Sequence, residues 1–408
     1  MPEFLTLDDV DVSGKTVLVR VDINSPVDPE TKRIIDDTRI RLHSKTIKEL
    51  SDKGAKVVIL AHQGRPGEPQ FTPLKEHAEI LGKILGRPVK YVDDVCGEKA
   101  QNAIKALNPG EILVLENVRT LPYETVKKSP EEHAKSDLVR NLAPLADLFV
   151  FDGFSVAHRA HASVVGFTAV LPSVAGRVME AELKALSKAL EAPEKPCIFI
   201  LGGAKAEKCV DIIRYTLENE IADKILTGGL VGHVLLAAKN VEIGEPNMQV
   251  LRKKGLAEII PTMAGLLDQY PERILLPEDL AIEVEGQRRE ITLSQLPTSY
   301  PIYDIGSQTM QKYSQLVQDA KSIVVSGPLG VYEKPPFDEG TRAVYGAVAQ
   351  SQAYSLAGGG DTSAVLKRLG LSEKFSYVST SGGAFIEYLM GKKLPAVEAL
   401  KQAAKRTQ

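Results

Sequence analysis

The sequence has little cysteine and no long apolar run. Its three cysteines, Cys96, Cys197 and Cys209, are odd in number and widely spaced. This pattern excludes a disulfide framework and a CxxC type of metal site, and we interpret all three as ordinary small side chains. No apolar run approaches the roughly 20 residues of a membrane-spanning helix. The start, "MPEFLTLDDVDVSG", lacks the basic and then apolar plan of a signal peptide. We therefore expect a cytoplasmic protein with no membrane partner.

An excess of charge of one sign and any low-complexity tract are also absent. The formal net charge is -3, charged residues make up 25% and hydrophobic residues 43% of the chain. This composition predicts a folded chain with no nucleic-acid partner. A length of 408 residues exceeds what one hydrophobic core usually organises, so we expect two domains.

What the sequence does contain is a repeated alternation of β-branched runs and helical patterns. The first half has "TVLVRVDIN", "KVVILAHQGRP", "EILVLENVR" and "LFVFDGFS"; the second has "CIFILGGAK", "ILTGGL", "RILLPEDLA", "SIVVSGPLG", "YSLAGGGDT" and "YVSTSGGA". Such runs are typical of strands buried on both faces, and their alternation with helices indicates parallel sheets covered by helices. The predicted fold class is α/β, with two doubly wound Rossmann-like domains.

The domain boundary is predicted near the segment "LPSVAGRVMEAELKALSKALEAPEKP". One helix is expected there, because Leu183, Leu186 and Leu190 repeat at helical spacing. This helix either serves as a hinge helix between the domains or only covers one sheet, and the sequence leaves both interpretations open.

The predicted organisation has three parts. Residues 1–172 form an N-terminal domain, residues 173–393 form a C-terminal domain that includes the interdomain helix, and residues 394–408 form a terminal helix with a basic tail. A polar interruption in the second half predicts a hairpin insertion that turns near Gly286.

Polar and cationic residues follow the strands of the first half. In open α/β sheets ligands bind outside the carboxyl ends of the strands, so these residues are informative. They are Asp22, Asn24, Arg39, His62, Arg65, Arg119, His158, Arg159 and His161. A single arginine is commonly a solvated surface residue. Because the guanidinium fork suits carboxylate and phosphate oxygens, several arginines at one crevice indicate a small polyanionic ligand.

Glycines follow the strands of the second half. They are Gly202 and Gly203, Gly228 and Gly229, Gly327 and Gly330, Gly358 to Gly360, and Gly382 and Gly383. Glycine lets backbone N–H groups approach a phosphate, and a helix that starts there adds its positive end. In "GGGDT", Asp361 would hold the cation of a nucleotide and Thr362 would donate a hydrogen bond. A tight turn with either residue as N-cap is the alternative interpretation.

Three rival motifs do not fit. In "SGKT" at residues 13–16, Asp9 stands where a P-loop has its first glycine, and a strand rather than a helix follows. Neither "GGLVG" nor "GPLG" matches the dinucleotide fingerprint, which argues against a dehydrogenase. The pair His158 and His161 lacks an obvious third metal ligand, and Arg159 between them would repel a cation.

With these residues in view, the chain resembles the phosphoglycerate kinases. The ordered blocks "VRVDINSP", "DDTRIR", "AHQGRP", "LENVR", "AHRAHAS", "LGGAKAEK", "SGPLGVYE", "GGGDTSAVL" and "STSGGA" carry the resemblance essentially from end to end. The variants "AHQGRPG" and "YDIGSQT" are similar to the archaeal branch. The resemblance implies reversible phosphoryl transfer between 1,3-bisphosphoglycerate and MgADP, giving 3-phosphoglycerate and MgATP.

The resemblance also implies roles for individual residues. The residues that it implies for substrate binding are Asp22, Asn24, Arg39, His62, Gln63, Gly64, Arg65, Arg119 and Arg159. Nucleotide binding falls to Gly203, Lys205, Gly228, Glu333, Gly359, Gly360, Asp361 and Thr362, with Asp361 facing the Mg2+ of the nucleotide. Catalysis falls to Arg39, Lys205 and the backbone N–H groups of Gly360 and Gly383. Many members of the family have a second lysine where this chain has Cys209, with Lys208 one position earlier.

Two other functions are weighed against this one. A kinase or ligase acting on a different small carboxylate would keep the glycines and change the arginines. A scaffold without activity would have lost Arg39, Lys205 or Asp361, and all three are present.

Overall fold

The computed structural model describes residues 3–407, and these divide into two compact units. The first runs up to Leu183 and includes the segment from Lys393 onward; the second is Lys184–Lys392. The division lies inside helix α7 (Arg177–Leu190) and differs from the boundary that we expected at residues 172 and 173. The reason is that the short strand β6 (Ser173–Ala175) pairs with β5 in the first sheet, so the chain leaves this unit later.

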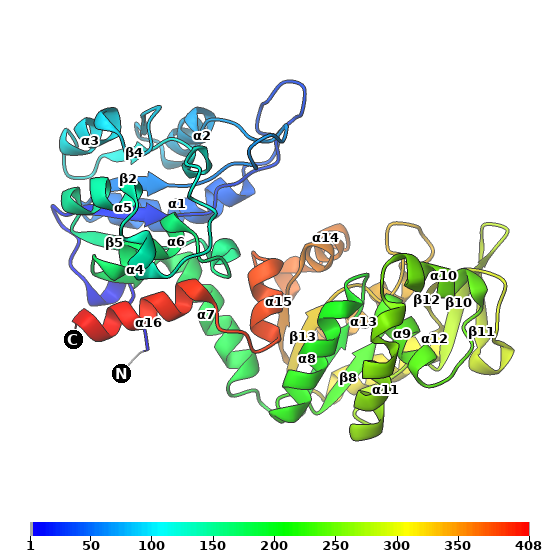
Figure 1. The fold of residues 1–408 in the computed structure, drawn as a ribbon. Helices are drawn as coiled ribbons and strands as arrows, with labels where there is room; N and C mark the ends of the chain where they lie inside the picture. The colour runs from blue at the N-terminus through cyan, green and yellow to red at the C-terminus, as the bar shows by residue number, and fades with distance from the viewer. Residues whose placement is uncertain (1–2, 408) are drawn as a thin grey trace. The chain divides into compact units, whose positions relative to one another are not determined.

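The first unit is built on a parallel six-stranded sheet of order β3-β4-β2-β1-β5-β6. Besides β6, its strands are β1 (Thr16–Arg20), β2 (Lys56–Leu60), β3 (Lys90–Tyr91), β4 (Ile112–Val114) and β5 (Leu148–Phe151). Its helices, besides the start of α7, are α1 (Thr38–Asp52), α2 (Lys75–Leu85), α3 (Glu98–Lys105), α4 (Pro130–His133), α5 (Asp137–Leu142), α6 (Ala162–Val165) and α16 (Pro395–Thr407). Figure 1 shows these helices on both sides of the sheet, as the doubly wound prediction requires.

Alternate residues of β1 pack on opposite faces of this sheet. Val17 and Val19 lie in a cluster with Ile40, Ile47 and Leu50 of α1, which covers that face. Leu18, between the two valines, is equally buried. Burial on both faces explains why the strand is a continuous apolar run.

The second unit contains a parallel six-stranded sheet of order β15-β14-β13-β7-β8-β9. Its strands are β7 (Cys197–Leu201), β8 (Lys224–Thr227), β9 (Ile274–Leu275), β13 (Ser322–Ser326), β14 (Tyr354–Ala357) and β15 (Tyr377–Val378). Its helices, besides the end of α7, are α8 (Ala206–Glu218), α9 (Gly229–Ala238), α10 (Glu245–Lys253), α11 (Ile260–Gln269), α12 (Ser307–Asp319), α13 (Glu339–Gln350), α14 (Gly360–Arg368) and α15 (Gly383–Leu389). Tyr313 and Val317 of α12 and Val344 of α13 pack on one face of the sheet.

A small antiparallel sheet accompanies the second one. Its order is β11-β10-β12, with β10 (Asp279–Val284), β11 (Gln287–Thr292) and β12 (Ile302–Ile305). Val284 pairs with Gln287, so the hairpin turns at residues 285 and 286, and the predicted turn near Gly286 is confirmed. The run "RILLPEDLA", which we took as one strand, is two: β9 belongs to the parallel sheet and β10 to the antiparallel one.

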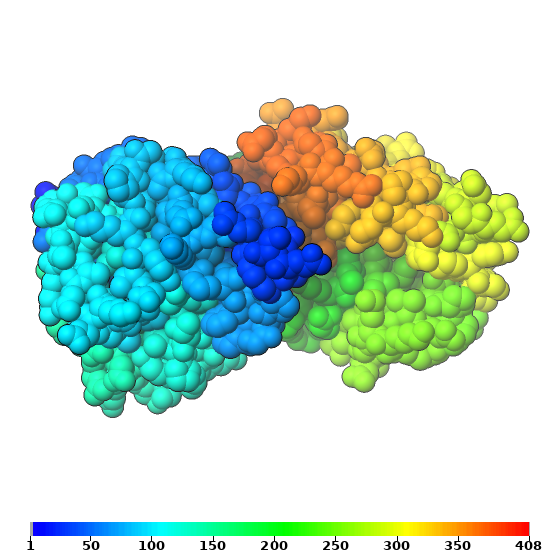
Figure 2. Space-filling model, turned by 90° about the horizontal axis from the view of Figure 1, so that it is seen from above, coloured from blue at the N-terminus to red at the C-terminus, as the bar shows by residue number. Residues whose placement is uncertain are grey.

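The segment between β1 and α1 forms a short hairpin-like excursion closed by a bridge between Val27 and Ile34. Its dark blue atoms stand out from the surface of the first unit in Figure 2. Ile35 at its end is 67% exposed. Within residues 3–407, no helix combines the length and the apolar character that crossing a bilayer requires.

Candidate active site

The cationic residues that we predicted in the first half gather at the carboxyl edge of the first sheet. Asp22 follows β1, His62 follows β2, Arg119 follows β4 and Arg159 follows β5. In a parallel sheet these strand ends share one edge, which explains how residues far apart in the chain meet. We refer to Arg39, His62, Arg65, Arg119 and Arg159 together as the cationic edge.

Arg39 is held by the loop after β1. Its Nη1 donates to Oδ2 of Asp22 at 2.9 Å and to the carbonyl oxygen of Asn24 at 3.2 Å. Both bonds use Nη1, and the side chain remains 42% exposed while that of Asp22 is 4% exposed. Asp22 also accepts from the hydroxyl of Ser155. This arrangement aims one edge of the guanidinium at the protein and leaves the rest of it for a ligand.

The carboxyl of Asp22 is ionised in spite of its burial. Burial alone raises its pKa, but the nearby charge of Arg39 and the hydrogen bond from Ser155 oppose this and hold the pKa below its usual value. Asp22 is therefore a fixed anion that orients Arg39 rather than a group that exchanges protons.

Gly64 connects two of the predicted substrate residues through its backbone. Its N–H donates to Oδ1 of Asn24 at 2.8 Å, and its carbonyl accepts from Nη1 of Arg119 at 2.6 Å. The backbone has a positive φ of 65°, and an added Cβ would lie 2.5 Å from the backbone of Gln70, so only glycine fits. The loop thus fixes the positions of Asn24 and Arg119 together.

Gln63 is fully buried, with 0% exposure. Its Oε1 accepts from the N–H of Ser25 at 2.8 Å and its Nε2 donates to the carbonyls of Ser25 and Gln70. Its backbone carbonyl accepts from Nδ2 of Asn117. All of these groups bind protein, so Gln63 braces the loop that carries His62 and Gly64.

The guanidinium groups of the cationic edge repel one another. Burial and the charges of Arg20, Arg159 and Arg65 together lower the pKa of Arg119 to about 10. An arginine still keeps its proton at neutral pH. Because these cations lie close enough to interact, a bound polyanion relieves repulsion as well as gaining hydrogen bonds.

Arg20 and His161 complete this region. Arg20, which we read only as part of the strand "TVLVR", is 1% exposed and donates from Nε to Oγ of Ser163. His161 is 4% exposed, and burial together with the charges of Arg20 and Arg159 lowers its pKa to about 3. Nothing in the alternation of β1 distinguishes a buried arginine from a solvated one, so the role of Arg20 could not be predicted from the sequence.

The glycines of the second half gather at the carboxyl edge of the second sheet. One narrow cavity there is lined by Gly203, Lys205, Lys208, Gly359, Gly360, Asp361, Thr362 and Gly382, among others. We refer to this set as the glycine edge. Helices α8, α14 and α15 all begin at it: Lys205, Gly359 and Gly382 are their N-caps. Converging helix N-termini offer unpaired N–H groups and positive dipole ends to an anion.

The backbone at the glycine edge is closely packed. The N–H of Gly203 donates to the carbonyl of Pro328 at 2.7 Å, and Gly203 has a positive φ of 76°. A Cβ added to Gly382 would lie 3.6 Å from the nitrogen of Gly360, so the starts of α14 and α15 are adjacent. The N–H of Gly327 donates to Oγ1 of Thr362 at 2.8 Å, which ties the loop after β13 to α14.

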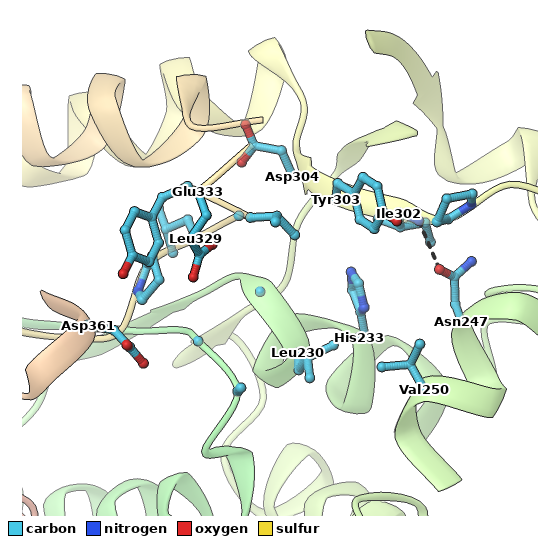
Figure 3. Close-up of a pocket in the computed structure, with 18 of the residues that line it drawn as sticks. Leu230, His233, Asn247, Val250, Ile302, Tyr303, Asp304, Leu329, Glu333 and Asp361 are labelled. Atoms are coloured by element: carbon cyan, nitrogen blue, oxygen red, sulfur yellow. Dashed lines mark hydrogen bonds between the residues drawn. The ribbon is translucent and has the colours of Figure 1, made fainter. Parts of the chain in front are cut away.

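An apolar pocket of about 300 Å³ adjoins the glycine edge and shares Gly203, Ala204 and Asp361 with it. Figure 3 shows Glu333 and Asp361 at one end of the pocket, and His233 and Val250 toward the other. His233 is buried, and burial lowers its pKa to about 4, so its imidazole is neutral at physiological pH. Asn247 accepts a hydrogen bond from the N–H of Ile302 at 2.8 Å.

Some predicted nucleotide residues lie beside the cavity rather than on its lining. Gly229 lines the apolar pocket, while Gly228 is the N-cap of α9 immediately before it. Gly382 lines the narrow cavity, while Gly383 is the first residue of α15. Glu333 lines the apolar pocket as expected for a residue near the sugar of a nucleotide.

Lys208 and Cys209 both line the narrow cavity with Lys205. The Cys209 thiol is buried, and burial raises its pKa to about 12, which keeps it protonated. Cys197 and Cys96 are likewise buried and free. Across residues 3–407, no three histidine, cysteine or acidic side chains are grouped as metal ligands.

Comparison with known proteins gives one family. The family model described as phosphoglycerate kinase matches residues 7–392. A phosphoglycerate kinase of Methanothermobacter thermautotrophicus is 46% identical over 401 residues, 98% of this chain and 97% of the relative. That of Methanothermus fervidus is 46% identical over 407 residues, 100% of this chain and 99% of the relative. The crystal structure of phosphoglycerate kinase from Pyrococcus horikoshii OT3 has a TM-score of 0.89 at 38% identity, covering 98% of this chain and 100% of the other.

Proposed function

Because the chain belongs to the phosphoglycerate kinase family, a family of glycolytic kinases that use a carboxyl group as acceptor, we propose that its cationic edge binds phosphoglycerate and its glycine edge binds MgATP. The proposed reaction is reversible, in-line transfer of a phosphoryl group between 1,3-bisphosphoglycerate and MgADP, giving 3-phosphoglycerate and MgATP. The observation that carries this assignment is the separation of two anion-binding chemistries, guanidinium groups in one unit and helix N-termini beside an apolar pocket in the other.

For the phosphoglycerate, we assign the phosphate to the arginines and His62 of the cationic edge. Asp22 and Asn24 hold Arg39 and Gly64 in place, and Gly64 holds Arg119. A phosphorylated hydroxy acid offers a phosphate and a carboxylate at the two ends of a short chain, and both match guanidinium donors.

For the nucleotide, we assign the base and sugar to the apolar pocket and the phosphates to the glycine edge. Glu333 would accept from the ribose hydroxyls, while Gly203, Lys205, Gly359, Gly360 and Thr362 would surround the phosphates. Gly228, the N-cap of α9, would contribute to nucleotide binding through the first turn of that helix.

Magnesium enters with the nucleotide as part of the substrate. Asp361 is exposed, lies in the first turn of α14 and lines both cavities. One carboxylate together with substrate phosphates is a usual environment for Mg2+, so Asp361 fits this ion. The ion would neutralise the phosphate charge that a carboxylate nucleophile must approach.

The chemistry needs positive charge rather than a base. The attacking group of 3-phosphoglycerate is a carboxylate, which is ionised at neutral pH, so no proton has to be removed. The moving phosphoryl group spreads charge over its equatorial oxygens, and we assign its stabilisation to Arg39, Lys205 and the N–H groups of Gly360 and Gly383. Since these residues belong to different units, transfer requires domain closure, which also excludes water.

The test is ADP release by the purified chain with MgATP and 3-phosphoglycerate, with the acyl phosphate trapped chemically. We expect ADP only when both substrates are present. A set of other small carboxylates tests the alternative acceptor, and turnover with one of them but not with 3-phosphoglycerate would replace the assignment. ATP binding without any turnover would indicate the scaffold alternative.

A matched pair of variants makes this test specific. Arg119→Ala removes a member of the cationic edge, and Arg140→Ala removes an arginine of α5 that is 64% exposed and pairs with Asp137 of the same helix. The first should raise the KM for 3-phosphoglycerate and the second should not. The cytoplasmic location expected from the sequence stays a prediction, which cell fractionation would test.

A further inference from the structure

A buried chain of hydrogen bonds runs from Glu124 to His62 in the first unit. Glu124 has 0% exposure, and its carboxylate accepts from the N–H of Ser163 at 2.9 Å and from its hydroxyl at 2.5 Å. The same Oγ accepts from Nε of Arg20 at 2.8 Å. Nη2 of Arg20 then lies 3.1 Å from Nδ1 of His62. Four segments of the chain thus meet in one continuous network.

The donors and acceptors of this network follow from chemistry. A guanidinium has five N–H donors and no acceptor. Nδ1 of His62 must therefore be the acceptor, which means that it carries no proton. In a neutral imidazole the proton is then on Nε2. An imidazolium would instead direct a second N–H at the guanidinium, and no hydrogen bond could form between them.

The burial of His62 and the charges around it also favour its neutral form. Charged groups near it are Arg20 and Asp22 on the strand β1 and the loop after it, Arg39 on α1, and Arg119 after β4. Burial and then the charge of Arg20 lower the pKa of His62 well below its ordinary value, and Asp22 opposes this only in part. His62 itself is 4% exposed.

We propose that Arg20 is a positioning residue, which holds His62 as the neutral tautomer with its proton on Nε2, so that His62 offers the substrate an N–H donor and no charge. The identity of that substrate as phosphoglycerate rests on the proposed function. Arg20 acts through His62, because its own side chain is 1% exposed and its nitrogens already bind Ser163, Val21 and His62. The charge of the ligand is then matched by the guanidinium groups alone.

The first experiment needs no variant. Nitrogen NMR of the full chain with labelled histidine, with His62 assigned by its absence in His62→Gln, reports which ring nitrogen carries a proton. We expect one neutral form with the proton on Nε2 throughout about pH 5 to 8, the range in which ordinary histidines titrate. A proton on Nδ1, or titration within this range, would overturn the proposal.

The second experiment tests whether Arg20 is what keeps His62 neutral with its proton on Nε2. Arg20→Met combined with Glu124→Gln removes both charges of the buried pair, which avoids leaving a lone buried carboxylate. In this variant the pKa of His62 should rise and its ring proton should no longer be confined to Nε2, while burial and Arg119 still hold the pKa below its ordinary value. The matched control is Arg20→Lys, which keeps a cationic donor opposite Nδ1 and should preserve the tautomer. If the double variant keeps the proton on Nε2 alone, Arg20 is not the cause.

The kinetic consequence is a new pH dependence. We measure the KM for 3-phosphoglycerate in the double variant divided by that of the parent chain, which cancels the titration of the substrate itself. This ratio should be about fivefold lower below the pKa that NMR gives for His62 in the double variant than above it, because a protonated His62 adds a charge-assisted hydrogen bond. The KM for MgATP, which we assign to the other unit, should not change. A ratio that stays flat across this pKa would refute the proposal even if both variants fold.

These results separate the proposal from the function on which it rests. Absence of turnover with 3-phosphoglycerate, together with the expected tautomer, would refute the proposed substrate and leave the role of Arg20 intact. Normal turnover with 3-phosphoglycerate, together with a proton on Nδ1 of His62, would refute the role of Arg20 and leave the proposed substrate intact.

Discussion

Replacing Arg39 with alanine removes the cation that donates to Asp22 and that we assign to the moving phosphoryl group. Loss of a single preorganised donor to a developing charge typically costs about 3 to 4 kcal/mol, or about 10²- to 10³-fold in kcat. The side chain is 42% exposed, so its ion pair with Asp22 adds only about 1 kcal/mol to folding after solvent screening. We therefore expect a folded variant whose kcat is about 10³-fold lower.

The nucleotide should bind this variant normally. Arg39 belongs to the first unit, and the residues that we assign to the nucleotide all belong to the second. Initial rates of ADP formation at saturating substrates give kcat, and calorimetric titration gives the Kd for MgATP. Arg39→Lys keeps the charge and cannot reproduce the planar fork, so its kcat should fall by only about tenfold.

Two results would refute this reasoning. A Kd for MgATP that rises about tenfold in Arg39→Ala would show that the division of ligands between the units is wrong. A kcat within about threefold of the parent chain would show that Arg39 does not stabilise the transferring group. The control Arg140→Ala, on α5, should leave both quantities unchanged.

Three further predictions concern other parts of the site. Asp361→Asn should raise the Mg2+ concentration needed for half-maximal rate by about tenfold and leave the KM for 3-phosphoglycerate unchanged, as magnesium titrations of the rate would show. Arg119→Ala should raise the KM for 3-phosphoglycerate by about tenfold to a hundredfold, and steady-state kinetics that show no change would exclude it from the substrate site. The pKa of His233 is lowered to about 4 in the folded chain, so the unfolded chain binds the extra proton and stability falls as pH drops from about 6.5 to 4. His233→Leu should remove up to about 3 kcal/mol of that loss, measured by urea unfolding at both ends of this range.

The sequence predicted the sheets well because their strands are buried on both faces. The run "TVLVR" became β1 and "CIFIL" became β7, and the residues after them lie at the carboxyl edges as expected. The glycine run in "GGGDT" predicted a turn as one interpretation, and Gly359 has a positive φ of 100°. Gly64, which was named only through the family resemblance, has a positive φ of 65°.

Other features depend on partners far away in the chain. The sequence around Ser173 gives a three-residue strand too short to recognise, and only its pairing with β5 keeps it in the first unit. The split between β9 and β10 depends on which sheet each one joins, and an apolar run is the same in both cases. The local sequence pattern therefore predicted the helices and strands, but not the boundary between the two units.

The role of Arg20 could not be predicted from the sequence for the same reason, because its hydrogen-bond partners lie far away in the chain. Its burial is stabilised by Ser163, 143 residues later, which accepts from its Nε and donates in turn to Glu124. A buried charge without such a partner costs several kcal/mol, so the three residues have to be explained together. In the sequence they are an arginine in a strand, a glutamate in a loop and a serine at the start of a short helix. Their joint position beside His62 is what turns an ordinary strand residue into a determinant of how the substrate site presents its protons.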